Sequence, residues 1–293
     1  PDISGSARFV NNFIVAWERE ESPGSLLTIR RRAVTFDGSP ILNATTVLSS
    51  SGVVYSKPQL SGTAGESDSL ADQRVILAAQ RTENGGSECV TRVLDGVTGG
   101  SVGGPLQVGD FGNDRRDPAG SSILDGDGTR LHLGAYVAQF TNDSDIALAL
   151  CRGNQIVDQE NLSLLEGDIF RDEFAPTVST DGNRFIVGYT HDIGGGQIRP
   201  HYAVVNAVGD ELQLVEGRVL ASADPNLQGL GQICMAGDTG GGLAVGAYVW
   251  TGFAGGNDVR GVILAPQDAL DDGFGPACEA VSTSTSTPAW IAL

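Results

Sequence analysis

Carboxylate side chains gather just before several apolar segments that are expected to form innermost strands of a repeated unit. Three aspartates each begin such a turn and four more acidic residues lie nearby, namely Asp110, Asp168, Asp224, Asp114, Asp117, Asp172 and Glu173. Glycoside hydrolysis needs two carboxyl groups about 5–10 Å apart, so Asp117, Asp172 and Glu173 are the candidate catalytic residues. Aspartates in turns also accept hydrogen bonds from backbone amides, which is a purely structural role.

A second acidic segment has the donor pattern of a cation site. The sequence Asp125-Gly-Asp127-Gly-Thr alternates oxygen-bearing side chains with glycine, and oxygen donors suit a hard cation such as Ca²⁺. Asp125 and Asp127 are therefore candidate calcium ligands, although the segment lacks the terminal Glu of an EF-hand loop and a tight hairpin also explains it. No other cofactor is expected, because the chain has no P-loop, nucleophile elbow or dinucleotide fingerprint. His132 lies within an apolar segment and is expected to be packed.

The four cysteines show neither C-x-x-C nor Cys/His metal spacing. Cys89 and Cys151 fall at similar places in successive repeats, and Cys234 and Cys278 both fall in the last one. Disulfides within each of these two pairs are predicted for an oxidising compartment. Four buried free thiols are the alternative.

Composition excludes some partners. The chain of 293 residues has 36 acidic and 18 basic residues and a net charge of −18, a surface that repels phosphate backbones. Lys57 is the single lysine. We expect no nucleic-acid partner, and no apolar run is long enough for a membrane span. The acidity favours an extracellular or cell-surface location.

A short apolar segment recurs along the whole chain. Its anchors are Phe13, Val75, Leu131, Phe185 and Leu243, about 58 residues apart, and such spacing is typical of a repeat architecture. We therefore expect one domain, residues 1–293, with repeats at about 1–52, 53–110, 111–168, 169–224 and 225–293.

Each repeat reads as a meander of four strands. In the fourth, a Thr-Asp-Gly-Asn turn precedes the apolar segment that starts at Arg184, and a Gly-Gly-Gly turn follows it. No helical periodicity of useful length separates the strands, which argues against βαβ units. Small four-stranded sheets must stack to bury their faces, so the sequence predicts an all-β fold, a five-bladed β-propeller. A β-sandwich and an open β array are the alternatives.

The two ends of the chain resemble the same strand. Residues 1–4 begin with Pro1, and the last six residues contain Pro288, Trp290, Ile291 and Leu293. The ends can share one blade and so close the ring. Alternatively, the last segment can complete a blade in a neighbouring copy and so build a polymer.

Two resemblances rest on short motifs. Residues 13–17, residues 29–32 followed by Asp37-Gly-Ser-Pro40, and residues 57–60 together resemble the tandem repeats of large secreted bacterial surface proteins. That resemblance implies a fold and an extracellular setting and no catalytic residue; residues 65–73 and 230–232 depart from the pattern. Arg116-Asp117-Pro118 resembles the R-D-P of five-bladed furanosidase-type glycosidases, whose matching nucleophile and acid motifs are absent here.

The main functional prediction is an extracellular, non-enzymatic structural or interaction module. It can self-assemble through its terminal strand into a filament or surface layer, with itself or an extracellular glycan or protein as partner. The alternative is a carbohydrate-active propeller, either a lectin or a glycosidase, that uses an acidic central mouth.

Overall fold

The computed structural model describes residues 1–4, 12–64, 69–109, 111–112, 114–124, 130–167, 171–180, 182–194, 197–220, 234–238, 243–251, 257–268 and 271–281. These residues form five antiparallel sheets of four strands each. Helix is limited to the 3₁₀ turn η1 (Leu70–Asp72) and the single turn α1 (Leu162–Leu165) in the described part of the chain. The expected all-β propeller of four-stranded meanders is confirmed.

Each sheet consists of four strands that are consecutive in the sequence. The first contains β1 (Asp2–Ile3), β2 (Asn12–Glu20), β3 (Leu27–Thr35) and β4 (Thr45–Leu48). The second contains β5 (Val54–Leu60), β6 (Arg74–Glu83), β7 (Gly86–Asp95) and β8 (Leu106–Val108). The third contains β9 (Asp114–Gly120), β10 (Leu131–Gln139), β11 (Ser144–Arg152) and β12 (Gln155–Asn161).

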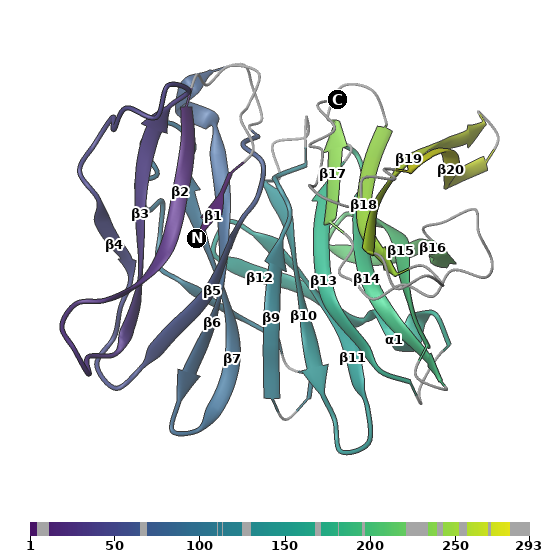
Figure 1. Ribbon diagram of the computed structural model, residues 1–293, viewed down its shortest axis with the longest axis horizontal. Helices are drawn as coiled ribbons and strands as arrows, with labels where there is room; N and C mark the ends of the chain where they lie inside the picture. Colours follow the sequence, from purple (N-terminus) through teal and green to yellow (C-terminus); the bar gives the residue numbers. More distant parts are fainter. Residues whose placement is uncertain are drawn as a thin grey trace.

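The remaining two sheets follow the same order. The fourth contains β13 (Glu173–Thr180), β14 (Phe185–Gly194), β15 (Gln197–Val208) and β16 (Glu211–Leu220). The fifth contains β17 (Cys234–Asp238), β18 (Leu243–Thr251), β19 (Asn257–Asp268) and β20 (Asp271–Val281). Figure 1 shows the sheets following one another in sequence order.

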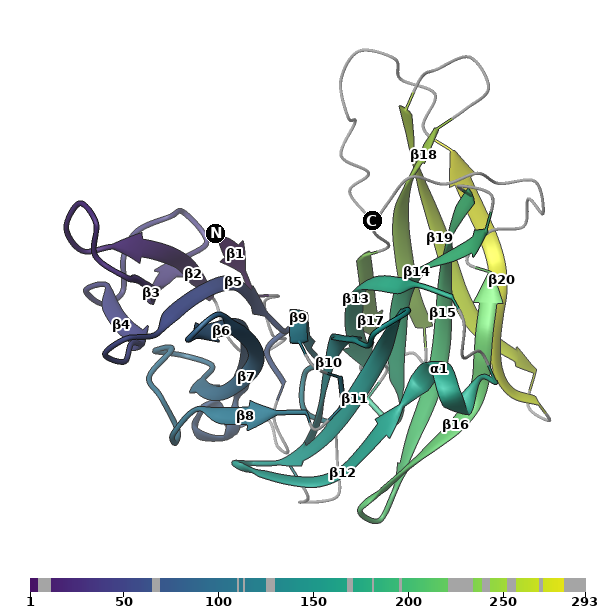
Figure 2. The same cartoon turned by 90° about the horizontal axis from the view of Figure 1, so that it is seen from below.

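The first strand of each sheet lies at the centre of the arrangement. Strand β5 contacts β1, β9 contacts β5, β13 contacts β9, and β17 contacts β13. Figure 2 shows the sheets placed along an arc, with the first sheet and the last at its two ends. The five first strands therefore form the inner wall, and the later strands lie progressively further out.

Apolar side chains fill the spaces between neighbouring sheets. Ile14 and Leu77 belong to one buried cluster between the first two sheets. Leu133 and Phe185 belong to another between the third and fourth sheets. Strand β10 is buried along nearly its whole length, because it is covered on both faces, which explains its continuous apolar sequence. His132 is fully buried within it, as expected.

A serine fixes the inner strand to the next strand in three sheets. The Ser4, Ser61 and Ser121 hydroxyls accept the backbone N–H of Ile14, Ile76 and Leu133 at 2.8–2.9 Å. The backbone N–H of each serine donates to the carbonyl of the same partner. Each of these serines is the fourth residue of a Pro-x-x-Ser sequence, which begins at Pro1, Pro58 and Pro118.

Carboxylates join neighbouring sheets through backbone amides. An oxygen of Asp2, Glu18, Asp114, Asp158 and Asp172 accepts the N–H of Leu60, Lys57, Ser87, Leu212 and Ser144, respectively, at 2.6–3.0 Å. In every case the donor belongs to an adjacent sheet. Hydrogen bonds with one charged partner are stronger than neutral ones, so part of the acidity serves to hold the sheets together.

Neither predicted disulfide fits the structure. Cys89 and Cys151 are both free and buried, within one apolar cluster. Burial raises the pKa of the Cys151 thiol to about 12, and it also raises that of Cys89. Cys234 and Cys278 lie on β17 and β20, the two edge strands of the last sheet. Three strand spacings of about 4.8 Å separate these strands, more than the roughly 7 Å that a disulfide spans.

Of the two chain ends that were expected to close the ring, only the N-terminal one lies within the described residues. Strand β1 pairs with β2 inside the first sheet, through Asp2↔Ala16 and Ile3↔Val15. Pro288, Trp290, Ile291 and Leu293, which were expected to close the ring or join a neighbour, lie outside the described residues.

The substitution Asp172→Ala is expected to lower the free energy of unfolding by about 1–2 kcal/mol, because it removes an acceptor from two donors of a buried residue. Asp172 Oδ1 accepts both the N–H and the hydroxyl of Ser144, at 2.8 and 2.9 Å. Urea denaturation checks the effect. The matched control is Asp210→Ala, which breaks an exposed ion pair with Arg152 and should cost less than about 1 kcal/mol. Equal losses for the two variants would contradict the role given to Asp172.

Lowering the pH is expected to destabilise the fold through His132. Burial lowers the pKa of His132 from 6.5 to about 4, partly offset by a backbone contact with Arg130. The unfolded chain binds this proton below pH 6.5, whereas the folded chain does so only near pH 4, so stability present above pH 6.5 is lost as the pH falls. Between pH 7 and pH 4 the loss is about 3 kcal/mol. In the variant His132→Leu, urea denaturation at both pH values should give a drop smaller by that amount; an unchanged drop contradicts the assignment.

Candidate functional site

The inner strands of three sheets share one irregularity. The pairing register shifts between Ser56 and Gln59 in β5, and between Phe174 and Thr177 in β13. In β9 the shift spans the residues between Arg116 and Ala119. At each place two residues oppose a single residue of the next strand, which is a β-bulge. The two bulged residues are Lys57-Pro58, Asp117-Pro118 and Ala175-Pro176.

Proline explains why the bulges form there. Proline has no N–H to donate to a strand ladder, so it is found at strand edges and bulges. The preceding residues Lys57, Asp117 and Ala175 have φ values of 51°, 50° and 53°. These values lie in the left-handed region, which non-glycine residues rarely occupy and which costs about 1–3 kcal/mol. Because a bulge re-aims side chains, the same geometry in three sheets directs three side chains to one place.

The three bulges line a common hollow. Its volume is about 290 Å³, and its walls are Lys57, Pro58, Gln59, Asp117, Ala175 and Pro176. Lys57 Nζ lies 2.5 Å from Asp117 Oδ1, with the two side chains 50% and 36% exposed. Because the inner strands of three sheets supply every one of these residues, the hollow lies at the mouth of the propeller centre.

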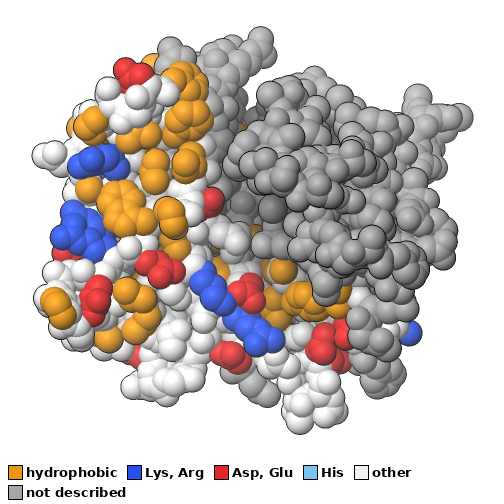
Figure 3. All heavy atoms as spheres, viewed as in Figure 1, with side chains coloured by type: hydrophobic (Ala, Val, Ile, Leu, Met, Phe, Trp, Pro, Cys, Tyr) orange, Lys and Arg blue, Asp and Glu red, His pale blue; other side chains and the backbone are white. Residues whose placement is uncertain are grey.

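Polar groups around the hollow hold its walls in place. The Lys57 N–H donates to Glu18 Oε1 of the first sheet at 2.6 Å. The Arg116 guanidinium donates to the Gln139 side-chain oxygen at 2.7 Å. Figure 3 shows basic and acidic side chains next to one another near the middle of this face. The one lysine of the chain is therefore fixed at its backbone and at its ammonium group by two different sheets.

Of the three candidate catalytic residues, only Asp117 lines the hollow. Asp172 accepts hydrogen bonds from Ser144 in the neighbouring sheet. Glu173 is fully buried, and its Oε2 accepts the hydroxyl of Ser163 at 2.7 Å. Asp114, which lies four residues before Pro118 as Asp172 does before Pro176, accepts the Ser87 N–H. Asp110, Asp168 and Asp224 lie outside the described residues.

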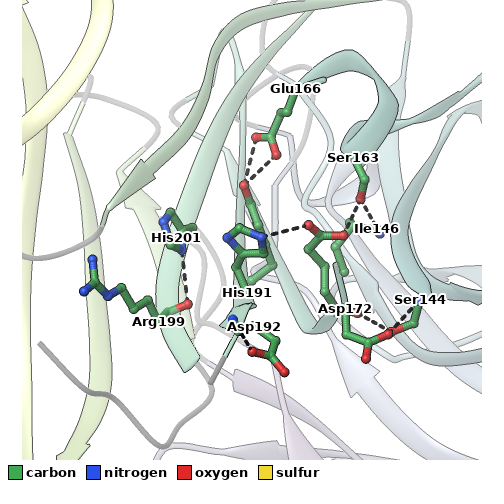
Figure 4. Close-up of polar contacts among 12 residues, drawn as sticks. Ser144, Ile146, Ser163, Glu166, Asp172, His191, Asp192, Arg199 and His201 are labelled. Carbon is green, nitrogen blue, oxygen red and sulfur yellow. Dashed lines mark hydrogen bonds and ion pairs between the residues drawn. The ribbon is translucent and has the colours of Figure 1, made fainter. Parts of the chain in front are cut away.

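Glu173 belongs to a buried polar cluster between the third and fourth sheets (Figure 4). Its Oε1 lies 3.4 Å from His191 Nε2, and the His191 ring packs edge-on against His201 at 5.2 Å. The Tyr189 hydroxyl donates to the Glu166 carboxylate. The exposed fractions of Glu173 and His191 are 0% and 2%, and the hydrogen bond between Glu173 and Ser163 joins the two sheets.

The remaining candidate residues supply no site in the described structure. Asp125 and Asp127, the predicted calcium ligands, lie outside the described residues. Elsewhere, the described side chains include no group of three or more His, Cys, Asp or Glu residues that could hold a metal ion. In the described part of the chain, no helix has the length and apolar character that crossing a membrane requires.

Sequence reasoning missed Lys57 and Ala175 as site residues. Both precede a proline that begins the Pro-x-x-Ser or equivalent segment of an inner strand, as Asp117 does. Aligning the repeats on Pro58, Pro118 and Pro176 places the three residues in register. The repeated proline was therefore the signal that could have identified them.

No family model matches the chain, and no curated protein matches it either. Among solved structures, a family 43 β-1,3-galactosidase is 10% identical with a TM-score of 0.47; the match covers 89% of this chain and 56% of that one. An exo-1,5-α-L-arabinanase from a bovine ruminal metagenomic library is 12% identical, with a TM-score of 0.46 and coverage of 97% and 96%. A family 43 enzyme from Xanthomonas citri, complexed with xylotriose, is 14% identical, with a TM-score of 0.45 and coverage of 98% and 93%.

These comparisons contradict the main functional prediction. The similar structures are those of glycosidases, so the prediction of a non-enzymatic, self-assembling module is corrected. At 10–14% identity the likeness shows the fold alone. The resemblance to repeat proteins is confirmed in its coarser part, the four-stranded propeller unit. Its finer part, a kinship with secreted surface proteins, stays a prediction.

The substitution Asp117→Asn is expected to change the free energy of unfolding by less than about 1 kcal/mol, because partly exposed ion pairs contribute little. Asparagine also tolerates the left-handed backbone that position 117 requires. Urea denaturation at neutral pH measures the change. A loss of several kcal/mol would show that Asp117 is a structural residue, and a small change makes this variant a clean probe of function.

Proposed function

We propose that this propeller is carbohydrate-active and holds a saccharide in the hollow at its central mouth. The observation that carries the proposal is the convergence of Lys57, Asp117 and Ala175 from three sheets on one hollow, each in a strained left-handed conformation. Residues held in such conformations cluster at ligand sites, where the surrounding fold maintains them.

The walls of the hollow differ in polarity in a way that suits a sugar. Lys57, Gln59 and Asp117 present an ammonium, an amide and a carboxylate, whereas Ala175 and the two prolines present only carbon. A sugar ring has hydroxyl groups at its edge and C–H groups on its faces. Asp117 and Gln59 accept hydrogen bonds from sugar hydroxyls, Lys57 donates to them, and the apolar wall receives a ring face.

Charge favours a neutral saccharide. The net charge of the chain is −18, so its long-range electrostatic field repels polyanionic glycans. Lys57, the one cation of the hollow wall, already faces the Asp117 carboxylate. The proposed ligand class is therefore an uncharged glycan.

Hydrolysis of a glycosidic bond is the second candidate, and Asp117 is the observation that favours it. Glycosidases pair two carboxyl groups about 5–10 Å apart, and Asp117 can supply one of them from the wall of the hollow. Among the described residues that line the hollow, Asp117 is the one carboxylate. Saccharide binding is the activity that these residues support directly.

Binding and hydrolysis are tested on one panel of sugars. Methyl glycosides of arabinose, xylose and galactose, together with xylotriose, are titrated into the protein by calorimetry and incubated with it for product analysis. We expect Asp117→Asn to weaken binding about 10–100-fold, because a hydrogen bond to a charged group contributes about 1.5–3 kcal/mol, and to abolish any hydrolysis.

The matched control is Asp210→Asn, since Asp210 is an exposed aspartate in an ion pair away from the hollow. It should bind as the unmodified protein does. Binding that is unchanged in Asp117→Asn, or the absence of binding and hydrolysis over the whole panel, would overturn the proposed function.

A further inference from the structure

We infer that Ala175 sets the size of the sugar that the central mouth accepts. This inference rests on the proposed function, since it assigns a specificity role within the same hollow. It starts from the equivalence of three positions, one in each of the three neighbouring inner strands β5, β9 and β13.

The backbone directs all three side chains in the same way. Lys57, Asp117 and Ala175 have φ values within 3° of one another, and each precedes a proline. In each case this residue and its proline form the bulge, so the two of them face a single residue of the next strand. All three line the hollow. A longer side chain at position 175 would therefore extend into the hollow, as those of Lys57 and Asp117 do.

Two of the three positions are already engaged with each other. The Lys57 ammonium and the Asp117 carboxylate meet at 2.5 Å, and this contact joins two neighbouring sheets. Ala175 contributes one methyl group beside Pro176. The space that is left for a ligand is thus the space that a larger residue at position 175 would occupy.

The size of the hollow makes this methyl group important. Its volume of about 290 Å³ lies at the lower end of the roughly 300–1,000 Å³ that small-molecule sites span. In such a site one methylene group changes discrimination by about 10–200-fold. Ala175 therefore discriminates between sugars by the size of their ring substituents. Its replacement by a larger residue should weaken the binding of a hexopyranoside, which has an extra hydroxymethyl group, more than the binding of a pentopyranoside.

A graded series at position 175 tests the inference: Ala175→Gly, Ala175→Ser and Ala175→Asn. Glycine relieves the left-handed backbone and keeps the space, and asparagine tolerates this backbone. The probes are methyl β-D-galactopyranoside and methyl β-D-xylopyranoside, titrated by calorimetry. We expect affinity within about twofold of the unmodified protein for glycine. For asparagine we expect a loss of at least about tenfold for the galactoside and a smaller loss for the xyloside.

Thermal unfolding of each variant separates specificity from folding. If the asparagine variant is unfolded, the comparison of serine with glycine decides, since the galactoside should bind the serine variant more weakly. Equal affinity of the two sugars across a folded series overturns the inference. If Asp117→Asn still weakens binding in that case, the proposed function stands without the role of Ala175. If no sugar binds the unmodified protein, both fail together.

Discussion

The absence of an N–H group on three inner-strand prolines is the constraint on which the mouth of this propeller depends. Pro58, Pro118 and Pro176 cannot donate to the strand ladder, so each inner strand bulges by one residue at that point. The residue before each proline then adopts positive φ. The strain is held in place by the regular ladder on both sides, because the strands pair again directly after the bulge. Without the bulge, the side chains of each inner strand would continue to alternate between the two faces of its sheet.

Acidic side chains have two separate duties in this chain. Asp2, Glu18, Asp114, Asp158 and Asp172 each accept a backbone N–H across a sheet boundary. Asp117 differs from these five, since its partner is the ammonium of the one lysine and both side chains remain accessible. The same residue type therefore joins sheets at these five positions and lines the hollow at position 117, and the local backbone decides which.

The fold could be predicted from the sequence because its signals are periodic. The anchors at Phe13, Val75, Leu131, Phe185 and Leu243 recur at a spacing that fits one meander, and each lies at or next to the start of the second strand of its sheet. The site was harder to predict, because it depends on a backbone geometry that single residues do not reveal. Glu173 and Asp117 are both acidic residues near an inner-strand proline, yet a two-residue difference in position buries one and exposes the other. The predicted Cys89–Cys151 disulfide was wrong for a similar reason: equal places in successive repeats put both thiols in one apolar cluster, yet both remain free.

The Pro-x-x-Ser segments separate the framework of the mouth from its chemistry. Proline sets the bulge, and in three sheets serine ties the inner strand to the next strand. The residue in front of the proline does not belong to the apolar layers that fill the spaces between neighbouring sheets. A single codon change at position 57, 117 or 175 can thus exchange an amine for an acid or a methyl group without disturbing those layers. Such an architecture lets the chemistry of the mouth diverge between descendants of one gene while the scaffold is inherited intact.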